Sequence, residues 1–213
     1  MDNYLGKFDF GQFINQKPKN NECCPDQVVG RMFNGKLFKV CRRSIDYRTV
    51  NGYYYISTEI ICPIAIVLES PHDKEFNNPI GPAKGVTGTR FFLYFEELIR
   101  KSKIYNKIKT GSHDIVFMNS IQYQCSLGEK LNRDTKRQRD DNWIKCFEGE
   151  NSCDIEKRLY AIKPYATINL CTKGKGSGKV TLQEMLQVKI CCMNNHTWGD
   201  HPYHWGYGKG KIH

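Results

Sequence analysis

The chain has 213 residues, enough for one domain with a well-buried core. Its 32 Lys and Arg residues outnumber 22 Asp and Glu residues, which leaves a formal net charge of +10. A surplus of this size favours a polyanionic partner, nucleic acid before an anionic membrane surface, over a chain that is simply basic. The sequence has neither an apolar run near the roughly 20 residues that span a bilayer nor the apolar core of a signal peptide. We therefore expect a cytoplasmic monomer that binds DNA and no membrane.

The first part of the chain reads as an extension ahead of the main fold. Residues 1–27 are polar and irregular, and two strand pairs follow at residues 28–39 and 45–57. Each pair contains an Asn-Gly turn between strand-forming residues, which is the strongest short signal for a hairpin. We expect residues 1–60 to form an arm with a β-hairpin extension, and residues 61–213 to form the main fold in one compact unit.

Strands and helices alternate along the rest of the chain. The expected strands are residues 64–68, 114–119, 166–171 and 188–193, and the expected helical segments are residues 88–103, 130–163 and 182–187. This alternation of short apolar strands with helices predicts an α/β protein with a parallel sheet between helices. The basic block at residues 130–139 fits either a solvated helix face or a DNA-facing surface.

Polar residues follow the expected strands, so the carboxyl ends of these strands would form one rim. Ligands of open α/β sheets bind outside these ends. The buried run at residues 64–68 is the clearest case, because acid–base side chains follow it at once. The polar residues after the four strands include Glu69, Ser70, His72, Asp73, Glu75, Asn119, Lys173, His196 and His201.

A glycine-rich segment, Lys-Gly-Lys-Gly-Ser-Gly-Lys, occupies residues 173–179 before an expected helix. Such turns expose backbone N–H groups to anions. The phosphate-loop pattern fails, however, because Lys173 stands at the required first glycine and Val180 follows Lys179. An ATPase is therefore disfavoured, and we expect Lys173, Lys175 and Lys179 to contact a DNA backbone.

The last segment combines histidines with aromatic and basic residues. Aromatic rings interleaved with lysines suit base stacking and phosphate contact, although the rings could instead cap the core. A metal site is also conceivable, but no acidic pattern at ligand spacing accompanies the histidines. Here we expect DNA contacts from Tyr203, His204, Trp205 and Lys209.

The cysteines do not indicate a metal centre. None of the ten forms a Cys-x-x-Cys pair, so the usual zinc and iron–sulfur spacings are missing. Several lie in apolar runs, where a free thiol packs as a small hydrophobic group. We expect structural thiols in a reducing compartment, with no cofactor and no metal.

The order of the rim motifs resembles that of the uracil-DNA glycosylase superfamily. The motifs are Glu-Ser-Pro-His at 69–72, Gly-Val-Thr-Gly at 85–88, Val-Phe-Met-Asn at 116–119 and His-Pro at 201–202. Family members carry a Gly-Gln-Asp-Pro-Tyr-His or Gly-Glu-Ala-Pro-Gly loop, then an Asn, then a His-Pro-Ser loop. The resemblance covers residues 64 to about 205 and implies a three-layer α/β/α sandwich with a central four-stranded parallel sheet.

The resemblance also implies roles for individual residues. Glu69 matches the glutamate of Gly-Glu-Ala-Pro-Gly, and Ser70 stands where the best-known members position water with an Asp. His201 matches the histidine that stabilises the departing base as an anion, and Asn119 matches the reader of the flipped pyrimidine. Asp73 and Glu75 are further candidates for the carboxylate that stabilises the sugar cation and orients water. Lys84 lies in the loop that faces the flipped nucleotide.

Two departures from the family pattern favour a bulky base. Ala83 occupies the place of the Phe that stacks on uracil, and His72 follows Pro71 in place of the Tyr that excludes C5-substituted pyrimidines. A pocket without these walls could admit hydroxymethylcytosine or its glucosylated form. The superfamily includes a bacterial antiphage glycosylase that removes the glucosylated base, and this chain looks compatible with that role in the bacterial cytosol or nucleoid.

The expected activity is therefore that of a monofunctional DNA glycosylase. It would hydrolyse the N-glycosidic bond of a flipped-out modified pyrimidine and leave an abasic site, with water as the nucleophile. Three alternatives stay open: a uracil-DNA glycosylase in base excision repair, a DNA-binding module of the same fold without chemistry, and a metal-dependent nuclease built from the terminal histidines.

Overall fold

The computed structural model describes residues 23–125, 133–149, 154–206 and 210–213. Its main sheet has six strands in the order β2-β1-β6-β5-β7-β8. The parallel part contains β5 (Ile64–Leu68), β6 (Ser112–Asn119), β7 (Ala166–Asn169) and β8 (His196–Trp198). Strand β5 is buried at all five positions, which explains its continuous apolar sequence. The predicted α/β class is confirmed.

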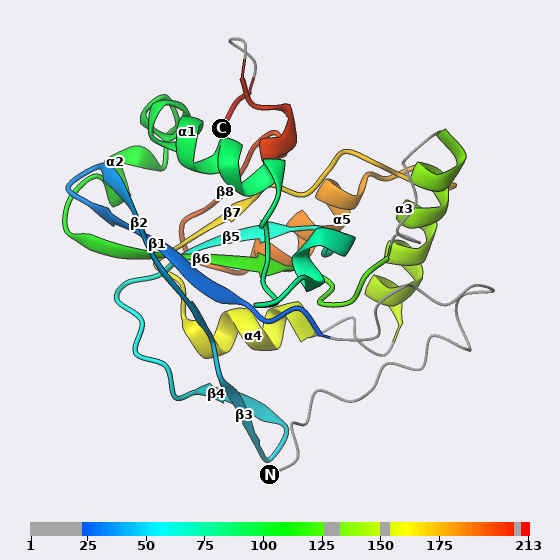
Figure 1. Ribbon diagram of the computed structural model, residues 1–213, viewed down its shortest axis with the longest axis horizontal. Helices are drawn as coiled ribbons and strands as arrows, with labels where there is room; N and C mark the ends of the chain where they lie inside the picture. The colour runs from blue at the N-terminus through cyan, green and yellow to red at the C-terminus, as the bar shows by residue number, and fades with distance from the viewer. Residues whose placement is uncertain (1–22, 126–132, 150–153, 207–209) are drawn as a thin grey trace.

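The first Asn-Gly hairpin belongs to the main sheet. The main sheet therefore has six strands, where the sequence analysis expected four. Strand β1 (Gln27–Phe33) pairs antiparallel with β2 (Lys36–Ser44) on one side and with β6 on the other. Most of β1 is buried, so its backbone N–H and C=O groups need hydrogen-bond partners, and a strand on each side provides them. The second hairpin, β3 (Tyr47–Val50) and β4 (Tyr53–Ile56), forms the separate two-stranded sheet at the bottom of Figure 1.

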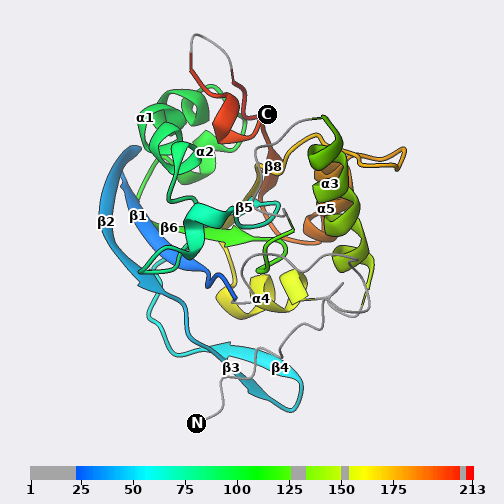
Figure 2. The same ribbon diagram turned by 45° about the vertical axis from the view of Figure 1, so that its right-hand side comes forward.

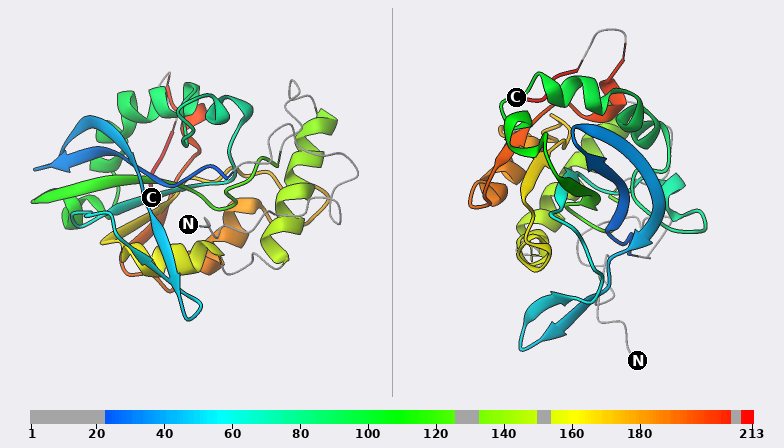
Figure 3. Two further views of the ribbon diagram at one scale, coloured as in Figure 1. Left: turned by 60° about the horizontal axis from the view of Figure 1, so that its bottom comes forward. Right: turned by 90° about the vertical axis from the view of Figure 1, so that its left-hand side faces the viewer.

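Helices lie on both faces of the main sheet (Figures 2 and 3). One face packs against α1 (Val86–Arg100) and α2 (Tyr105–Ile108). The other packs against three helices, namely α3 (Arg133–Glu148), α4 (Asp154–Ile162) and α5 (Leu182–Ile190). Alternate residues of β5 serve the two cores, since successive side chains of a strand point to opposite faces.

The strand expected at residues 188–193 is wrong, because these residues end α5 and form the turn after it. Leu182, Leu186 and Ile190 recur at helical spacing and are buried, whereas Val188 is 71% exposed. The helix begins with a capping box at residues 181–184, a Thr-x-x-Glu pattern that is visible in the sequence. The short apolar run was compatible with either structure, and the capping pattern distinguishes them.

A buried arginine joins three parts of the fold. Arg158 of α4 donates from Nη1 to both carboxylate oxygens of Asp26, over 2.9 and 2.8 Å. Its Nη2 donates to the main-chain oxygens of Asn119 (2.9 Å) and Ser120 (3.1 Å), and its Nε donates to Asp154 (2.6 Å). The segment before β1, the end of β6 and helix α4 are thereby fixed together.

Two further observations concern membranes and thiols. No helix within the described ranges is long and apolar enough to cross a bilayer. The cysteines at the described positions are free thiols, and Cys125, Cys146 and Cys171 are buried in the cores. Cys153 lies outside the described residues.

Replacement of Arg158 by Met should lower the free energy of unfolding by about 3–5 kcal/mol, because it leaves the Asp26 carboxylate buried without its cation. Urea unfolding measures this change. The matched control is Lys157→Met, an exposed position on the same helix, which should stay within about 0.5 kcal/mol of the wild type. A loss below about 1 kcal/mol for Arg158→Met would show that the ion pair does not hold these elements.

Candidate active site

The candidate site lies at the carboxyl ends of the parallel strands. The chain leaves β5 toward α1 on one face of the sheet and leaves β7 toward α5 on the other. The neighbouring ends of β5 and β7 are therefore a topological switch point, where open α/β sheets bind ligands. Glu69 follows β5 directly, and Asn119 is the last residue of the adjacent strand β6.

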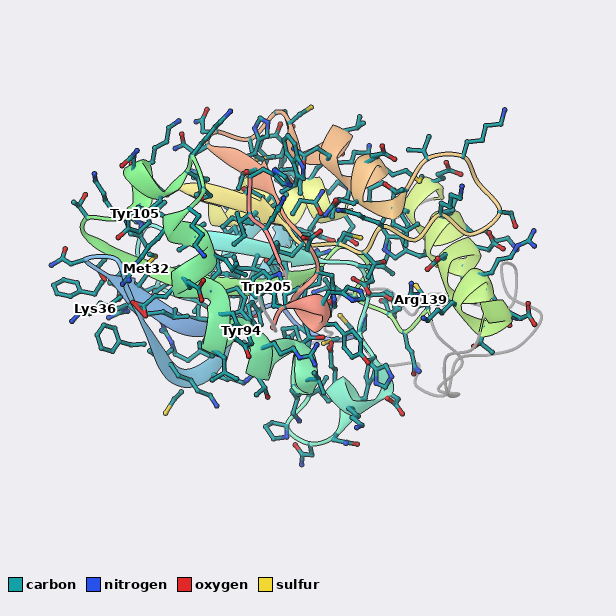
Figure 4. The ribbon with its side chains drawn as sticks, turned by 90° about the horizontal axis from the view of Figure 1, so that it is seen from above. Met32, Lys36, Tyr94, Tyr105, Arg139 and Trp205 are labelled. Carbon is teal, nitrogen blue, oxygen red and sulfur yellow. The ribbon has the colours of Figure 1, made fainter. Side chains whose placement is uncertain are left out.

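Glu69 lies between a histidine and an arginine. Its Oε2 is 3.4 Å from Nε2 of His201, and its Oε1 is 3.9 Å from Nη1 of Arg139. Arg139 points from α3 toward the middle of the molecule (Figure 4). Glu69 Oε2 is buried and makes no hydrogen bond within the described part of the chain. This carboxylate oxygen is positioned to accept a hydrogen bond from water or a substrate.

His201 is arranged as a neutral hydrogen-bond donor. Its Nδ1 accepts the backbone N–H of Tyr203 over 3.2 Å, so the ring proton lies on Nε2, which faces Glu69. Burial lowers the pKa of His201, an effect that the charge of Glu69 opposes and that His204 and Arg139 reinforce. The imidazole therefore presents an N–H group to the site without carrying a full charge at neutral pH.

Asn119 is held by a second carboxyl group. Its Nδ2 donates to Glu75 Oε2 over 3.3 Å and to Cys24 Sγ over 3.7 Å, whereas its Oδ1 is buried without a partner in the described ranges. Burial raises the pKa of Glu75 to about 8, although the hydrogen bonds from Asn119 and the Ala83 backbone act in the opposite direction. Glu75 is therefore mostly protonated at neutral pH, and Asn119 turns an acceptor toward the site.

The structure brings together Glu69, His201, Glu75 and Asn119, but it separates Asp73 and His72 from them. Asp73 accepts the backbone N–H of Lys74 over 2.8 Å and contacts the ring of His72. The His72 side chain is exposed and caps the 3-10 helix η2 (Asp73–Phe76). Both side chains serve the start of η2, so the expectation that His72 binds the base and that Asp73 is catalytic stays a prediction.

Ser70 and Ala83, the two other residues predicted to bind the base, make contacts within the protein. The Ser70 side chain forms a hydrogen bond with the buried thiol of Cys125. The Ala83 methyl group belongs to the core beneath α1 and does not face a ligand, which corrects its expected role. A Cβ at Gly88 would overlap with the Ala83 carbonyl oxygen, so this glycine allows the loop to approach α1 closely. The Ala83 backbone contributes instead by its hydrogen bond to Glu75.

The glycine-rich loop is fastened to α3 rather than shaped as a phosphate cradle. The Ser177 backbone N–H donates to Asp141 over 2.6 Å, and a Cβ at Gly174 would overlap with the Asp140 carboxylate. Close packing against these two aspartates explains the need for glycine. Lys173 pairs with Asp200 over 2.8 Å. Lys175 and Lys179 are exposed, and their contact with DNA stays a prediction.

The terminal aromatic residues divide into a buried and an exposed set. Trp205 is 1% exposed, stacks on Phe91 and donates from its indole nitrogen to the Asp200 carbonyl oxygen. It lies against α1 (Figure 4), so its predicted DNA contact is wrong and its ring belongs to the core. Tyr203 is 53% exposed and His204 is also exposed, next to His201.

The two remaining predicted DNA-binding lysines have different outcomes. Lys84 donates from Nζ to the carbonyl oxygens of Asn77 (2.5 Å) and Pro79 (2.6 Å), so its amine fastens its own loop. The expected contact of Lys84 with DNA stays a prediction. Lys209 lies outside the described residues, and its prediction is untested.

Arg139, Cys24 and Arg42 contact or influence the candidate site residues, and the sequence did not predict them. Arg42 of β2 donates to the Pro82 carbonyl oxygen over 2.6 Å, and its charge favours the ionised form of Glu75. The sequence carries no local signal for these contacts, because each partner is far away along the chain. Arg139 was visible only as one residue of a basic block.

Comparison of the chain with protein-family models, curated proteins and solved structures returned no match. Across the described ranges, no group of three or more His, Cys, Asp or Glu side chains is placed to hold a metal ion. The proposal for function therefore depends on the geometry of the site and on the motif order.

Replacement of Glu75 by Gln should flatten the dependence of stability on pH. The folded state keeps the Glu75 proton up to about pH 8, whereas the unfolded chain releases it near 4.5. The stability that this proton contributes is complete below pH 4.5 and is lost as the pH rises to about 8. Urea unfolding at about pH 5 and pH 8 should show a larger loss for the wild type than for Glu75→Gln.

The matched control for this experiment is Glu97→Gln, which alters an exposed carboxylate on α1. It should keep the pH dependence of the wild type. If Glu75→Gln also keeps that dependence, Glu75 is ionised in the folded protein and the assigned protonation state is contradicted.

Proposed function

We propose that the protein is a monofunctional DNA glycosylase that hydrolyses the N-glycosidic bond of a flipped-out modified pyrimidine and leaves an abasic site. The observation that carries this proposal is the meeting of Glu69, His201 and Asn119 from three separate strand ends, where two buried acceptor atoms have no partner among the described residues. The same three residues carry the resemblance to the uracil-DNA glycosylase superfamily. The net charge of +10 supports DNA as the partner.

Glu69 and His201 each have a role in the hydrolysis. When the bond between C1′ and the base breaks, its electron pair stays on the base and the sugar becomes positive. The Glu69 carboxylate stabilises this cation, and its free Oε2 orients the water whose oxygen then bonds to C1′. The Nε2–H of His201 donates to the departing base anion, which finally takes up the proton released by the water. Preorganised donors of this kind contribute about 3–4 kcal/mol each.

Asn119 supports a base of the cytosine type. Its Nδ2 donates one hydrogen to Glu75 and the other to Cys24, so Oδ1 is the atom available to the base. An acceptor at this place pairs with the exocyclic amino group of cytosine, whereas uracil offers a carbonyl oxygen at the same position. Within the family resemblance, this favours hydroxymethylcytosine or its glucosylated form, in line with the absence of a Tyr after Pro71. Removal of such bases fits antiphage defence in the bacterial cytosol or nucleoid.

A second candidate function is that of a DNA-binding module without chemistry. Ser70 favours it, because this serine stands where the best-known members of the family position water with an aspartate. The hydrogen bond between Ser70 and Cys125 gives the serine a structural use that needs no reaction. Uracil excision in base excision repair is the alternative within the enzymatic proposal.

Duplexes that carry uracil, hydroxymethylcytosine or glucosylated hydroxymethylcytosine should distinguish these functions. Alkaline cleavage after incubation measures abasic sites, and we expect them with the cytosine derivatives. Glu69→Gln and His201→Ala should each lower the rate by about 10²–10³-fold, because each removes a group that stabilises charge in the transition state. Binding of the same duplex should be retained.

Asp73→Asn is the matched control, because this carboxylate lies outside the assembled group. It should leave the rate within about threefold of the wild type. The glycosylase proposal fails if no substrate gives abasic product, and binding that persists in that case would identify the module without chemistry.

A further inference from the structure

A basic cavity lies beside β8, the strand at one edge of the main sheet. Its volume is about 740 Å³, and it opens between the end of α1, the start of β8 and residues 210–213. His196, the first residue of β8, lines this cavity, whereas His201 follows the other end of the strand. The cavity lining among the described residues includes none of Glu69, Asn119 and His201, so the two sites use different residues.

The charged side chains that line the cavity are basic. Lys101, Lys103, Lys107 and Lys211 line it, and no Asp or Glu is among the described residues that line it. Lys101 pairs with Glu97 over 2.5 Å, and Lys107 donates to the Asn195 side chain over 2.6 Å. The amines of Lys103 and Lys211 make no hydrogen bond or ion pair with the described residues. Two amines are thus available for an anionic ligand.

An exposed tryptophan provides a flat apolar wall. Trp198 is 43% exposed, and its ring stacks with His213 at a centroid distance of 5.5 Å and an angle of 29°. The other two tryptophans of the chain, Trp143 and Trp205, are fully buried. Every nucleobase has a flat face that can extend such a stack, and lysines beside the stack can hold the phosphates between bases.

We propose that this cavity, lined by Trp198, Lys103 and Lys211, binds a single-stranded segment of nucleic acid. A base stacks on Trp198, and the neighbouring phosphates pair with the two amines. A duplex keeps its bases paired and stacked, so it cannot use the indole in this way. This contact does not depend on the glycosylase chemistry, because it involves none of the residues at the carboxyl ends of β5 and β6.

Intrinsic fluorescence tests this proposal directly, because Trp198 is the one accessible tryptophan. Titration with a single-stranded oligothymidylate of about 12 nucleotides should quench the emission in a saturable way. Trp198→Phe should remove the quenching while a labelled oligonucleotide still binds by anisotropy. The double variant Lys103→Glu with Lys211→Glu should weaken binding at least ~10-fold and lower the salt slope by about 1.4, since each phosphate contact with a single strand contributes about 0.7.

The matched control reverses two exposed lysines at the opposite face of the sheet, Lys157→Glu with Lys163→Glu. It has the same net charge as the cavity variant and should bind like the wild type. Glu69→Gln should also show wild-type quenching, which separates this proposal from the glycosylase. The proposal is overturned if the cavity variant and the control titrate alike, if binding leaves the emission unchanged, or if duplex DNA quenches equally well.

Discussion

The buried ion pair between Arg158 and Asp26 is the interaction on which the candidate site depends. A buried guanidinium must have its donors satisfied, and those of Arg158 that do not reach a carboxylate reach the carbonyl oxygens of Asn119 and Ser120. The Ser120 hydroxyl in turn donates to the main-chain oxygen of Glu69 over 2.6 Å. One ion pair thus sets the relative positions of the end of β6 and the residue after β5.

The environment of each group then determines its chemistry. Glu75 is deeply buried and keeps its proton at neutral pH, so it can support the amide of Asn119 without adding a charge. Glu69 has Arg139 nearby and one oxygen that meets no hydrogen-bond partner in the part of the chain that the structure describes. His201 is buried and neutral, with its proton on the nitrogen that faces Glu69. Environments that separate the protonation states of neighbouring groups are typical of acid–base sites.

Local patterns in the sequence predicted some of the elements and part of the site. The two Asn-Gly turns and the apolar run of β5 were sufficient for the hairpins and the first parallel strand, and the rule for strand ends placed Glu69 and Asn119 on one rim. His201 was expected after a strand at residues 188–193, which instead end α5 and form a turn, so its place after β8 did not follow from that rule. The pairing of β1 with β6 joins segments about 80 residues apart, and no local pattern encodes it. The same holds for Arg158 and Arg139. Trp205 was misassigned because a buried and a stacking aromatic residue look alike in a sequence.

The most direct test of the central claim is mass spectrometry of the products formed from a duplex that contains glucosylated hydroxymethylcytosine, with the reaction run in ¹⁸O-labelled water. The proposed site predicts an intact free base and a deoxyribose that carries one ¹⁸O at C1′, with both phosphodiester bonds next to it unbroken. A duplex recovered without loss of the base, or cut at a phosphodiester bond while the base stays attached, would contradict the account.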